Sequence, residues 1–232
     1  MDWQRLIQYD QQLLLQLNGS DSLFWDGFMM TVTKTGTWIP LAVVLFYVLI
    51  KNNNMRNVLF ILLMIALSIT IADQFASTFC KPYFKRFRPT KNDPILMYQV
   101  DVVNNYRGGL YGFISSHAAN TFAVFVYVAL LIRNRALTFT LFFWAALCSY
   151  SRIYLGVHYP GDILAGALAG SAIGALLGYC THLFQRKNGD VRPYISSQYT
   201  STGYLQEDVH LLLLVFFLTL CYAAIQGAVR FV

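Results

Sequence analysis

Long apolar runs alternate with short polar linkers along most of this chain. A helix needs about 20 apolar residues to cross the roughly 30 Å of membrane hydrocarbon, and six runs reach this length with their flanks. The runs cover approximately Thr37–Ile50, Val58–Cys80, Ala118–Ile132, Leu137–Ser151, Ile163–Phe184 and Val209–Val229. No segment shows the two-residue alternation of a membrane β-barrel strand. The pattern predicts an all-α membrane protein with six transmembrane helices.

The first 19 residues follow a different pattern. Apolar side chains recur there at helical spacing on one side, and polar side chains, Asp10 among them, lie on the other. This is typical of an amphipathic helix that lies in the membrane interface. Since the pattern shows no further boundary, we expect one domain over residues 1–232, with an extra C-terminal span at about 209–229.

Composition narrows the class of protein. The chain is 56% apolar and 16% aromatic, and only 12% of its residues are charged, against roughly 25% in soluble domains. These values exclude a disordered chain and argue against an ordinary soluble enzyme. Four cysteines are too few for a disulfide scaffold, and they lie in apolar runs without metal-binding spacing. The net charge of +6 is consistent with the basic cytoplasmic loops of membrane proteins. No nucleic-acid partner is expected, because no basic stripe lies on a soluble module.

Six spans would place the linkers alternately on the two sides of the membrane. One side carries the N-terminal segment, residues 81–117, residues 152–162 and the C-terminus, and the other carries residues 51–56, 133–135 and 185–208. Both sides are basic, so the positive-inside rule alone leaves the orientation open. If the cations of the first side bind substrate, the second side is cytoplasmic.

The fifth apolar run carries a glycine at every fourth position, at Gly166, Gly170, Gly174 and Gly178. A stripe of small residues lets another helix approach closely. The stripe predicts tight helix packing but leaves open whether the partner helix is internal or belongs to a second subunit. The sequence therefore predicts no oligomeric state.

Polar residues gather at three widely separated places, all on the first side. They are residues 81–89 after the second run, residues 115–117 before the third, and residues 151–162 between the fourth and the fifth. Ionisable residues at membrane spans are costly and mark functional sites. Because the alternation of spans brings the three segments to one face, we expect them to form a single site.

Three cations in these segments suit an anion. Arg88 and Arg152 carry planar guanidinium groups that match phosphate oxygens, and Lys81 adds a point charge. Ser115 and Ser116 precede a predicted helix, whose N-terminus attracts anions through its free backbone N–H groups. These residues predict a binding site for a phosphate group.

Three further residues supply nucleophilic and acid–base chemistry. Pro160 suits the first turn of the fifth run, so Asp162 falls in that turn, near enough to accept a hydrogen bond from His158. A carboxylate in this position orients an imidazole whose other nitrogen is free to attack phosphorus. His117 is a second titratable group, able to protonate the leaving oxygen. The set predicts phosphoryl transfer through a phosphohistidine.

Each part also has a simpler explanation. Cations beside a span commonly anchor it at the headgroups, and we expect Lys85, Arg86 and Lys91 to do only that. Ser-Ser-His before a helix is a common cap, and a histidine four residues before an aspartate occurs by chance. The three parts on one face are much less easily coincidental. No metal cofactor is expected, because a two-metal site needs several carboxylates or histidines and Glu207 is the single glutamate.

The three segments resemble the signature of the type 2 phosphatidic acid phosphatase superfamily, with Lys81-x6-Arg88-Pro89, Ser115-x-His117 and Ser151-Arg152-x5-His158-x3-Asp162. The resemblance covers the second to the fifth span, at about 58–184. It implies a six-helix membrane phosphatase with its site at the outer face and no cofactor. The implied reaction is hydrolysis of a lipid-linked phosphate or diphosphate, with inorganic phosphate as product.

The resemblance also assigns residues to roles. It implies that His158 is the nucleophile, Asp162 its partner and His117 the acid. It further implies phosphate binding by Lys81, Arg88, Ser115, Ser116 and Arg152.

One position departs from the family pattern. The second motif is usually Pro-Ser-Gly-His and here reads Ile114-Ser115-Ser116-His117. The added Cβ at Ser116 puts its backbone contact with phosphate in question. The stretch over residues 112–118 is similar to a bacterial subgroup that includes lipid A phosphatases.

The sequence leaves the lipid open. Undecaprenyl diphosphate, a lipid A phosphate, phosphatidylglycerol phosphate and phosphatidic acid are the candidates. Residues 90–114 are expected to form an ordered lid over the headgroup, because a segment of this length with its own tyrosines is seldom a passive linker. The expected location is a bacterial inner membrane, with the site facing the periplasm.

Three other functions compete with this interpretation. Vanadate-binding haloperoxidases share these motifs, but they are soluble. A transporter would need ionisable groups or broken helices near the membrane midplane, where only Asp73 and Gln74 come close. A structural membrane protein without activity would have no need of His117, His158 and Asp162.

Overall fold

The computed structural model describes residues 3–92, 94–189 and 197–229. Within these ranges the chain is helical, with isolated β-bridges and no strand. The α-helices are α1 (Trp3–Leu17), α2 (Leu23–Val32), α3 (Ile39–Asn52), α4 (Met55–Gln74), α5 (Lys81–Phe84), α6 (Pro94–Gln99), α7 (Ser116–Ile132), α8 (Arg135–Tyr154), α9 (Pro160–Lys187) and α10 (Gln206–Val229). The prediction of an all-α fold is confirmed.

Five helical segments among the described residues are long and apolar enough to cross a membrane. They are Thr35–Asn52, Met55–Phe84, Arg135–Tyr154, Pro160–Lys187 and Gln206–Val229. The remaining predicted span corresponds to α7, a shorter apolar helix of 17 residues. At about 1.5 Å per residue, the 17 residues of α7 extend about 25 Å. The helix begins directly after its capping residue, Ser115, at one end of the bundle. The six predicted spans are thus five long segments and one shorter helix.

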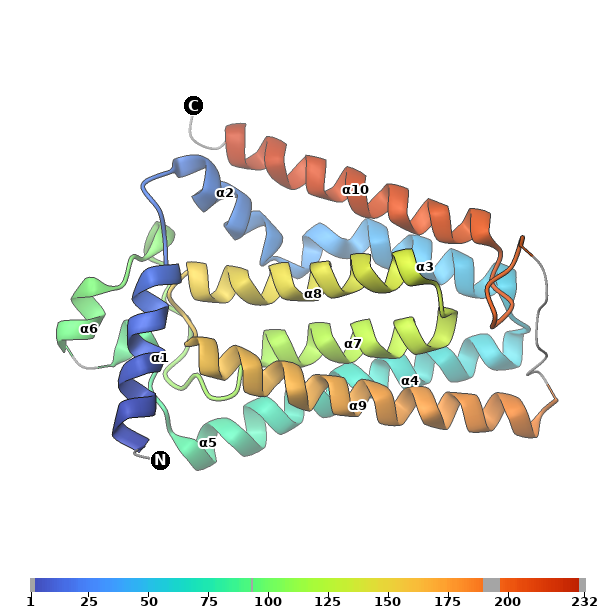
Figure 1. Cartoon of the computed structure of the whole chain (residues 1–232), viewed down its shortest axis with the longest axis horizontal. Helices are drawn as coiled ribbons and strands as arrows, with labels where there is room; N and C mark the ends of the chain where they lie inside the picture. The colour runs from blue at the N-terminus through green and yellow to red at the C-terminus, as the bar shows by residue number, and fades with distance from the viewer. Residues whose placement is uncertain (1–2, 93, 190–196, 230–232) are drawn as a thin grey trace.

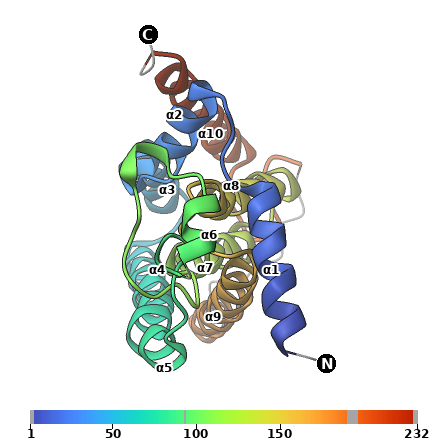
Figure 2. The same cartoon turned by 90° about the vertical axis from the view of Figure 1, so that its left-hand side faces the viewer.

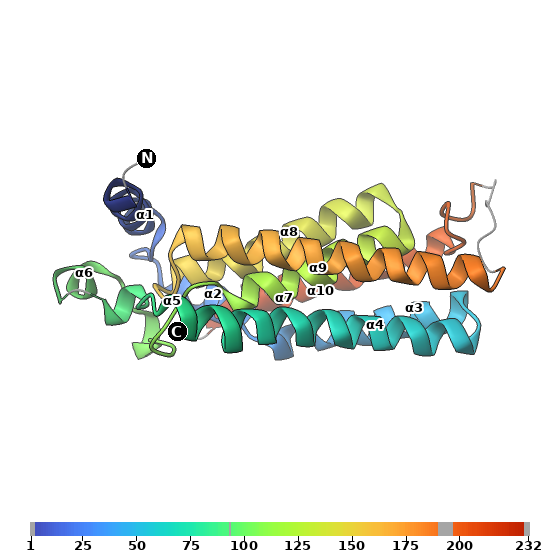
Figure 3. The same cartoon turned by 90° about the horizontal axis from the view of Figure 1, so that it is seen from below.

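The long helices run side by side, and the short elements gather at one end of the bundle (Figures 1 and 3). Helix α1 lies across this end, beside the C-terminal end of α8 and the N-terminal end of α9, and α6 lies at the same end (Figure 2). Leu14 of α1 is fully buried in a cluster with Tyr159 and Ile163. The predicted N-terminal helix is therefore present and packed on the bundle, while its position in the membrane interface stays a prediction.

A break in the helix separates α2 from the first span, Thr35–Asn52. Between α2 and α3 the chain leaves the α-helix and forms the 3₁₀ turn η1 (Thr35–Trp38). Carbonyl groups freed by the break accept side-chain hydrogen bonds, from Thr37 Oγ1 to Thr31 O at 2.6 Å and from Trp38 Nε1 to Val32 O at 2.9 Å. Such substitutes are needed because hydrocarbon offers the backbone no partner. The break leaves Thr33 pointing toward α8.

Helices α7 and α9 form the most extensive helix pair, and the glycine stripe is their contact. A Cβ at Gly166, Gly170 or Gly174 would overlap backbone carbonyl oxygens of residues 115–123. The partner helix that the sequence left open is therefore internal. The same contact holds the two N-terminal ends together, since the Ser115 N–H donates to the Asp162 carbonyl at 3.1 Å.

We expect Gly170→Ala to destabilise the protein by about 1–3 kcal/mol, the usual effect of overpacking. Its Cβ would overlap the Ala119 carbonyl oxygen, which is backbone and cannot yield. Thermal unfolding in detergent measures the change. Gly178→Ala is the matched control, because its Cβ meets only the flexible Leu130 side chain at 3.1 Å. Equal melting temperatures for the two variants would contradict close packing at Gly170.

Candidate active site

The three polar segments meet at the end of the bundle where α1 and α6 lie (Figures 1 and 2). The long helix through α4, the π-helical turn η2 (Phe75–Cys80) and α5 delivers Lys81, and α7 delivers His117 in its first turn. Arg152 lies in the last turn of α8, and His158 in the short connection to α9. The predicted convergence is confirmed, because His117 and His158 both lie within electrostatic range of Lys81, Arg88 and Arg152.

Lys81 is held by two hydroxyl groups. Its Nζ donates to Ser77 Oγ at 3.2 Å and to Ser116 Oγ at 3.1 Å. The hydroxyl at the position where the family pattern has glycine therefore fixes a cation of the site. Ser115 acts differently, because its side chain caps α7 by accepting from the Ala118 N–H at 3.4 Å and is fully buried.

The two arginines are buried and lack carboxylate partners in the described structure. Arg88 is 8% exposed and donates to the carbonyl oxygens of Tyr111 and Val157 at 3.1 and 3.3 Å. Arg152 is 3% exposed and donates to Thr33 Oγ1 at 2.7 Å and to the Tyr106 hydroxyl at 3.0 Å. Its Nε is buried without a partner. Because their partners are neutral groups, the positive charges of both arginines are not compensated, and each can attract an anion.

His158 and Asp162 form the predicted contact. His158 Nδ1 lies 3.3 Å from Asp162 Oδ2, and both side chains are almost fully buried. The same oxygen accepts the Tyr159 N–H at 3.1 Å, so the carboxylate also caps α9. Burial, reinforced by Arg88, Arg152 and Lys81, lowers the pKa of His158 well below its ordinary value. The imidazole is therefore neutral at neutral pH, and a proton on Nδ1 leaves Nε2 with a free lone pair.

One prediction about the cations is wrong. Arg86, expected to be a headgroup anchor, turns inward and donates to Asp162 Oδ1 at 2.9 Å. Its neighbour Lys85 is exposed and adopts a positive φ of 46°. The left-handed residue reverses the chain direction after α5, so the next side chain points back to the bundle. Both neighbours are basic, so the sequence gives them the same expected role, whereas the turn exposes Lys85 and directs Arg86 to Asp162.

Sequence analysis missed two further residues of the site. Thr33 lies 119 positions from Arg152, and only the break after α2 brings its hydroxyl to the guanidinium. Tyr106 is one of several tyrosines in the predicted lid, and no sequence pattern distinguishes it from the others. Both residues hold Arg152 from outside the three motifs.

Residues 90–114 lie at this end of the bundle. Asp93, which belongs to the predicted lid, is outside the described residues. The Asn92 amide donates to the Tyr159 hydroxyl at 2.7 Å, and the Thr90 hydroxyl donates to the Arg107 carbonyl at 2.9 Å. Tyr106 connects the segment to Arg152. Its role as a lid over a headgroup stays a prediction.

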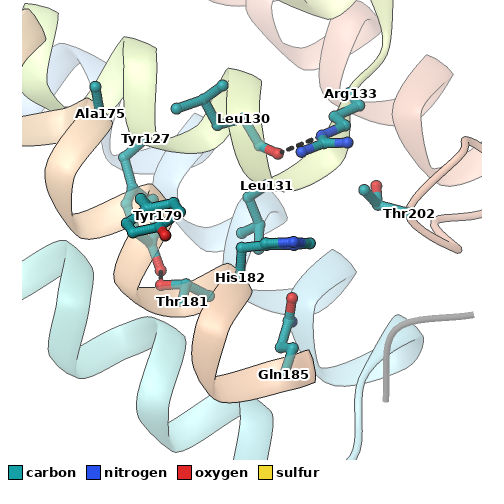
Figure 4. A pocket seen from close by; sticks show the side chains of 11 residues that line it. Tyr127, Leu130, Leu131, Arg133, Ala175, Tyr179, Thr181, His182, Gln185 and Thr202 are labelled. Atoms are coloured by element: carbon teal, nitrogen blue, oxygen red, sulfur yellow. Dashed lines mark hydrogen bonds between the residues drawn. The ribbon is translucent and has the colours of Figure 1, made fainter. Parts of the chain in front are cut away.

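No group of three His, Cys, Asp or Glu side chains that could hold a metal ion occurs among the described residues. The expectation of chemistry without a cofactor stays a prediction. A cavity of about 140 Å³ between α7 and α9 lies toward the opposite end, where His182, Gln185 and Arg133 line it (Figure 4). It contains none of the motif residues and is not the site described above.

Comparison with known proteins places the motif region in one family. Residues 57–190 match the family model described as the PAP2 superfamily. The chain is 41% identical over 177 residues to a lipid A 4′-phosphatase of Bacteroides thetaiotaomicron, covering 76% of this chain and 79% of that protein. It is 35% identical over 181 residues to a lipid A 4′-phosphatase of Porphyromonas gingivalis, covering 78% and 76%.

Two solved structures have a similar fold. The crystal structure of LpxE from Aquifex aeolicus aligns with a TM-score of 0.51 at 25% identity, over 74% of this chain and 93% of that one. The transmembrane PAP2-type phosphatidylglycerolphosphate phosphatase from Bacillus subtilis aligns with a TM-score of 0.55 over 79% and 87%. Its identity of 19% supports the fold alone.

We expect Tyr106→Phe to weaken the binding of inorganic phosphate about tenfold, because Arg152 loses a partner that orients it. Calorimetric titration of the detergent-solubilised protein with phosphate measures the affinity. Tyr98→Phe, in the same segment but 83% exposed, is the control and should bind as the wild type does. Unchanged affinity in Tyr106→Phe would show that Arg152 needs no support from this segment.

Proposed function

The chain belongs to the PAP2 superfamily and is a lipid phosphate phosphatase, and we propose that it hydrolyses the 4′-phosphate of lipid A through a phosphohistidine. The similarity to two lipid A 4′-phosphatases over more than three quarters of this chain carries the choice of lipid. It favours lipid A over undecaprenyl diphosphate, phosphatidylglycerol phosphate and phosphatidic acid.

In this proposal the phosphate enters between the three cations. Arg152 Nε, buried and without a partner, is one donor ready for a phosphate oxygen. Lys81 and Arg88 supply further charge, and the first turn of α7 adds backbone N–H groups at Ser116 and His117 that have no intrahelical acceptor. Ser115 contributes by capping that turn, and the Ser116 hydroxyl by holding Lys81.

The first chemical step is attack on phosphorus by His158 Nε2. The N–P bond forms while the bond from phosphorus to the sugar oxygen breaks, and His117 gives its proton to that oxygen. Asp162 stabilises the positive charge that develops on the His158 ring through the Nδ1 hydrogen bond. The cations stabilise the charge on the phosphoryl oxygens.

The second step returns the enzyme to its starting state. Water attacks phosphorus, the N–P bond breaks, and His117 takes the proton from the water molecule. Inorganic phosphate leaves, and His158 is again neutral. Each residue thus ends the cycle in the protonation state in which it began.

The protein spans a membrane several times, and we place it in the inner membrane of a bacterium with the site at the outer face. The opposite end carries the cations expected of cytoplasmic loops, namely Lys51, Arg56, Arg133, Arg135, Arg186 and Lys187. Arg192, assigned to the same end, lies outside the described residues. Residues 90–114 would cover the lipid headgroup.

Purified protein in detergent should release phosphate from lipid A in the presence of EDTA, and mass spectrometry should locate the loss at the 4′-position. Undecaprenyl diphosphate, phosphatidylglycerol phosphate and phosphatidic acid complete the panel, and His158→Ala is the inactive control. A faster reaction on another lipid of the panel would overturn the substrate assignment. Inhibition by EDTA would overturn the metal-free mechanism.

Asp162→Asn should lower kcat by about 10⁴-fold, by analogy with the carboxylate that orients histidine in serine proteases. An amide that keeps its oxygen toward Nδ1 points its NH2 group at the Arg86 Nη1 donor, so the group is driven out of this orientation. It also provides no charge to stabilise the phosphorylated ring. Steady-state phosphate release measures kcat. Activity within tenfold of the wild type would exclude Asp162 as the partner of the nucleophile.

A further inference from the structure

Arg86 joins the carboxylate next to His158 to a second carboxylate on α1. Its Nη1 donates to Asp162 Oδ1 at 2.9 Å, and its Nη2 donates to Asp10 Oδ2 at 2.7 Å. The side chains of Asp10, Arg86 and Asp162 are 16%, 25% and 0% exposed. A continuous series of contacts therefore runs from Asp10 on α1 through Arg86 and Asp162 to His158.

The guanidinium of Arg86 is held on its face as well as at its edges. Its Cζ lies 4.0 Å from the centre of the Tyr159 ring. Tyr159 is fully buried, and its hydroxyl accepts a hydrogen bond from Asn92. A cation stacked on an aromatic face and bonded at both nitrogens has little freedom to rotate.

Asp10 also binds the start of α9 directly. Its Oδ1 accepts the Gly161 N–H at 2.8 Å, one residue before Asp162. A Cβ at Gly161 would lie 2.8 Å from Asp10 Oδ2, so a larger residue there would displace the Asp10 carboxylate. Asp10 thus fixes both the arginine and the backbone that carries Asp162.

We propose that Arg86 and Asp10 are positioning residues for the phosphatase reaction, and that α1 is part of the catalytic apparatus. The proposal rests on the proposed function of His158 and Asp162. In the described structure Arg86 contacts Asp10, Asp162 and the Tyr159 ring, none of which is a proposed phosphate-binding residue. Its effect passes through the orientation of Asp162, and the effect of Asp10 passes through Arg86 and Gly161.

Both carboxylate oxygens of Asp162 have partners. Oδ2 is used by His158 and by the Tyr159 N–H, and Oδ1 accepts from Arg86. Without Arg86 a fully buried carboxylate would lose the donor to Oδ1, and an unsatisfied buried charge is strongly unfavourable. The carboxyl group would rotate or take up a proton, and either change would remove its support from the His158 ring.

Helix α1, which carries Asp10, lies outside the residues that match the family model. Asp10 precedes residues 57–190, the part of the chain that the family model covers. Helix α1 lies across the end of the bundle, where its Asp10 reaches the first turn of α9 (Figure 2). The matched core alone would leave Arg86 with one carboxylate partner where the whole chain provides two.

The test compares Arg86→Gln and Asp10→Asn with neighbouring controls of the same charge change, Lys85→Gln and Asp21→Asn. Lys85 and Asp21 are exposed, and no contact of either side chain contributes to the site. Turnover is measured on whichever lipid of the panel the wild type hydrolyses fastest. This choice separates a wrong lipid assignment from a wrong positioning role.

We expect kcat to fall about 10–100-fold in Arg86→Gln and Asp10→Asn, by analogy with partners that orient metal-bound histidines. KM should stay within about twofold of the wild type, since the phosphate-binding cations are unchanged. The double variant should lose more than Arg86→Gln alone but less than the product of the two single losses, because the two residues share the contact between Arg86 and Asp10 while Asp10 also binds Gly161 directly. Arg86→Lys, which keeps the charge, should recover part of the loss.

Three results would overturn the proposal. The first is a kcat in both variants equal to that of the controls. The second is a loss confined to KM. The third is a loss of activity proportional to the loss of folded protein, measured by melting temperature and gel-filtration elution, because this would leave the two residues only a structural role.

Discussion

The contact between α7 and α9 is the constraint on which the rest of the site depends. Three glycines of α9 let the two backbones touch, so the N-terminal ends of both helices arrive at the same place. The Ser115 N–H donates to the Asp162 carbonyl at this point. One helix contributes Ser116 and His117, and the other contributes Asp162 and the connection that carries His158. A larger residue between the helices would move His117 away from His158.

Charge in the site is divided according to the partners that each group has. The cations Lys81, Arg88 and Arg152 are held by hydroxyl and carbonyl groups, which orient them without neutralising them. Arg86 instead faces two carboxylates. The first three groups stay uncompensated and can attract an anion, whereas Arg86 pairs with the carboxylate beside His158. Four cations at one end of the bundle thereby differ in what they can bind.

Support for these groups comes from segments outside the motifs. Thr33 lies at the break between α2 and the first span, Tyr106 lies in the segment before α7, and Asp10 lies on α1. The family match begins at residue 57, so Thr33 and Asp10 precede it. Segments outside residues 57–190 therefore contact Arg152 and, through Arg86, Asp162 in this chain.

The amino-acid sequence by itself determined the helical class, the apolar segments and the three motifs that meet at one end. Hydrophobic runs of membrane length and fixed motif spacings are local properties, so they can be read without the fold. The helix start at Pro160 and the contact of His158 with Asp162 followed for the same reason, because they lie within one helical turn. Tertiary structure alone decided that α7 is the partner of the glycine stripe, that α2 does not continue into the first span, and that Arg86 turns inward while Lys85 stays exposed. The contacts of the glycine stripe join residues 51 positions apart, such as Gly170 and Ala119, and Arg86 lies 76 positions from Asp162. No local pattern contains that information.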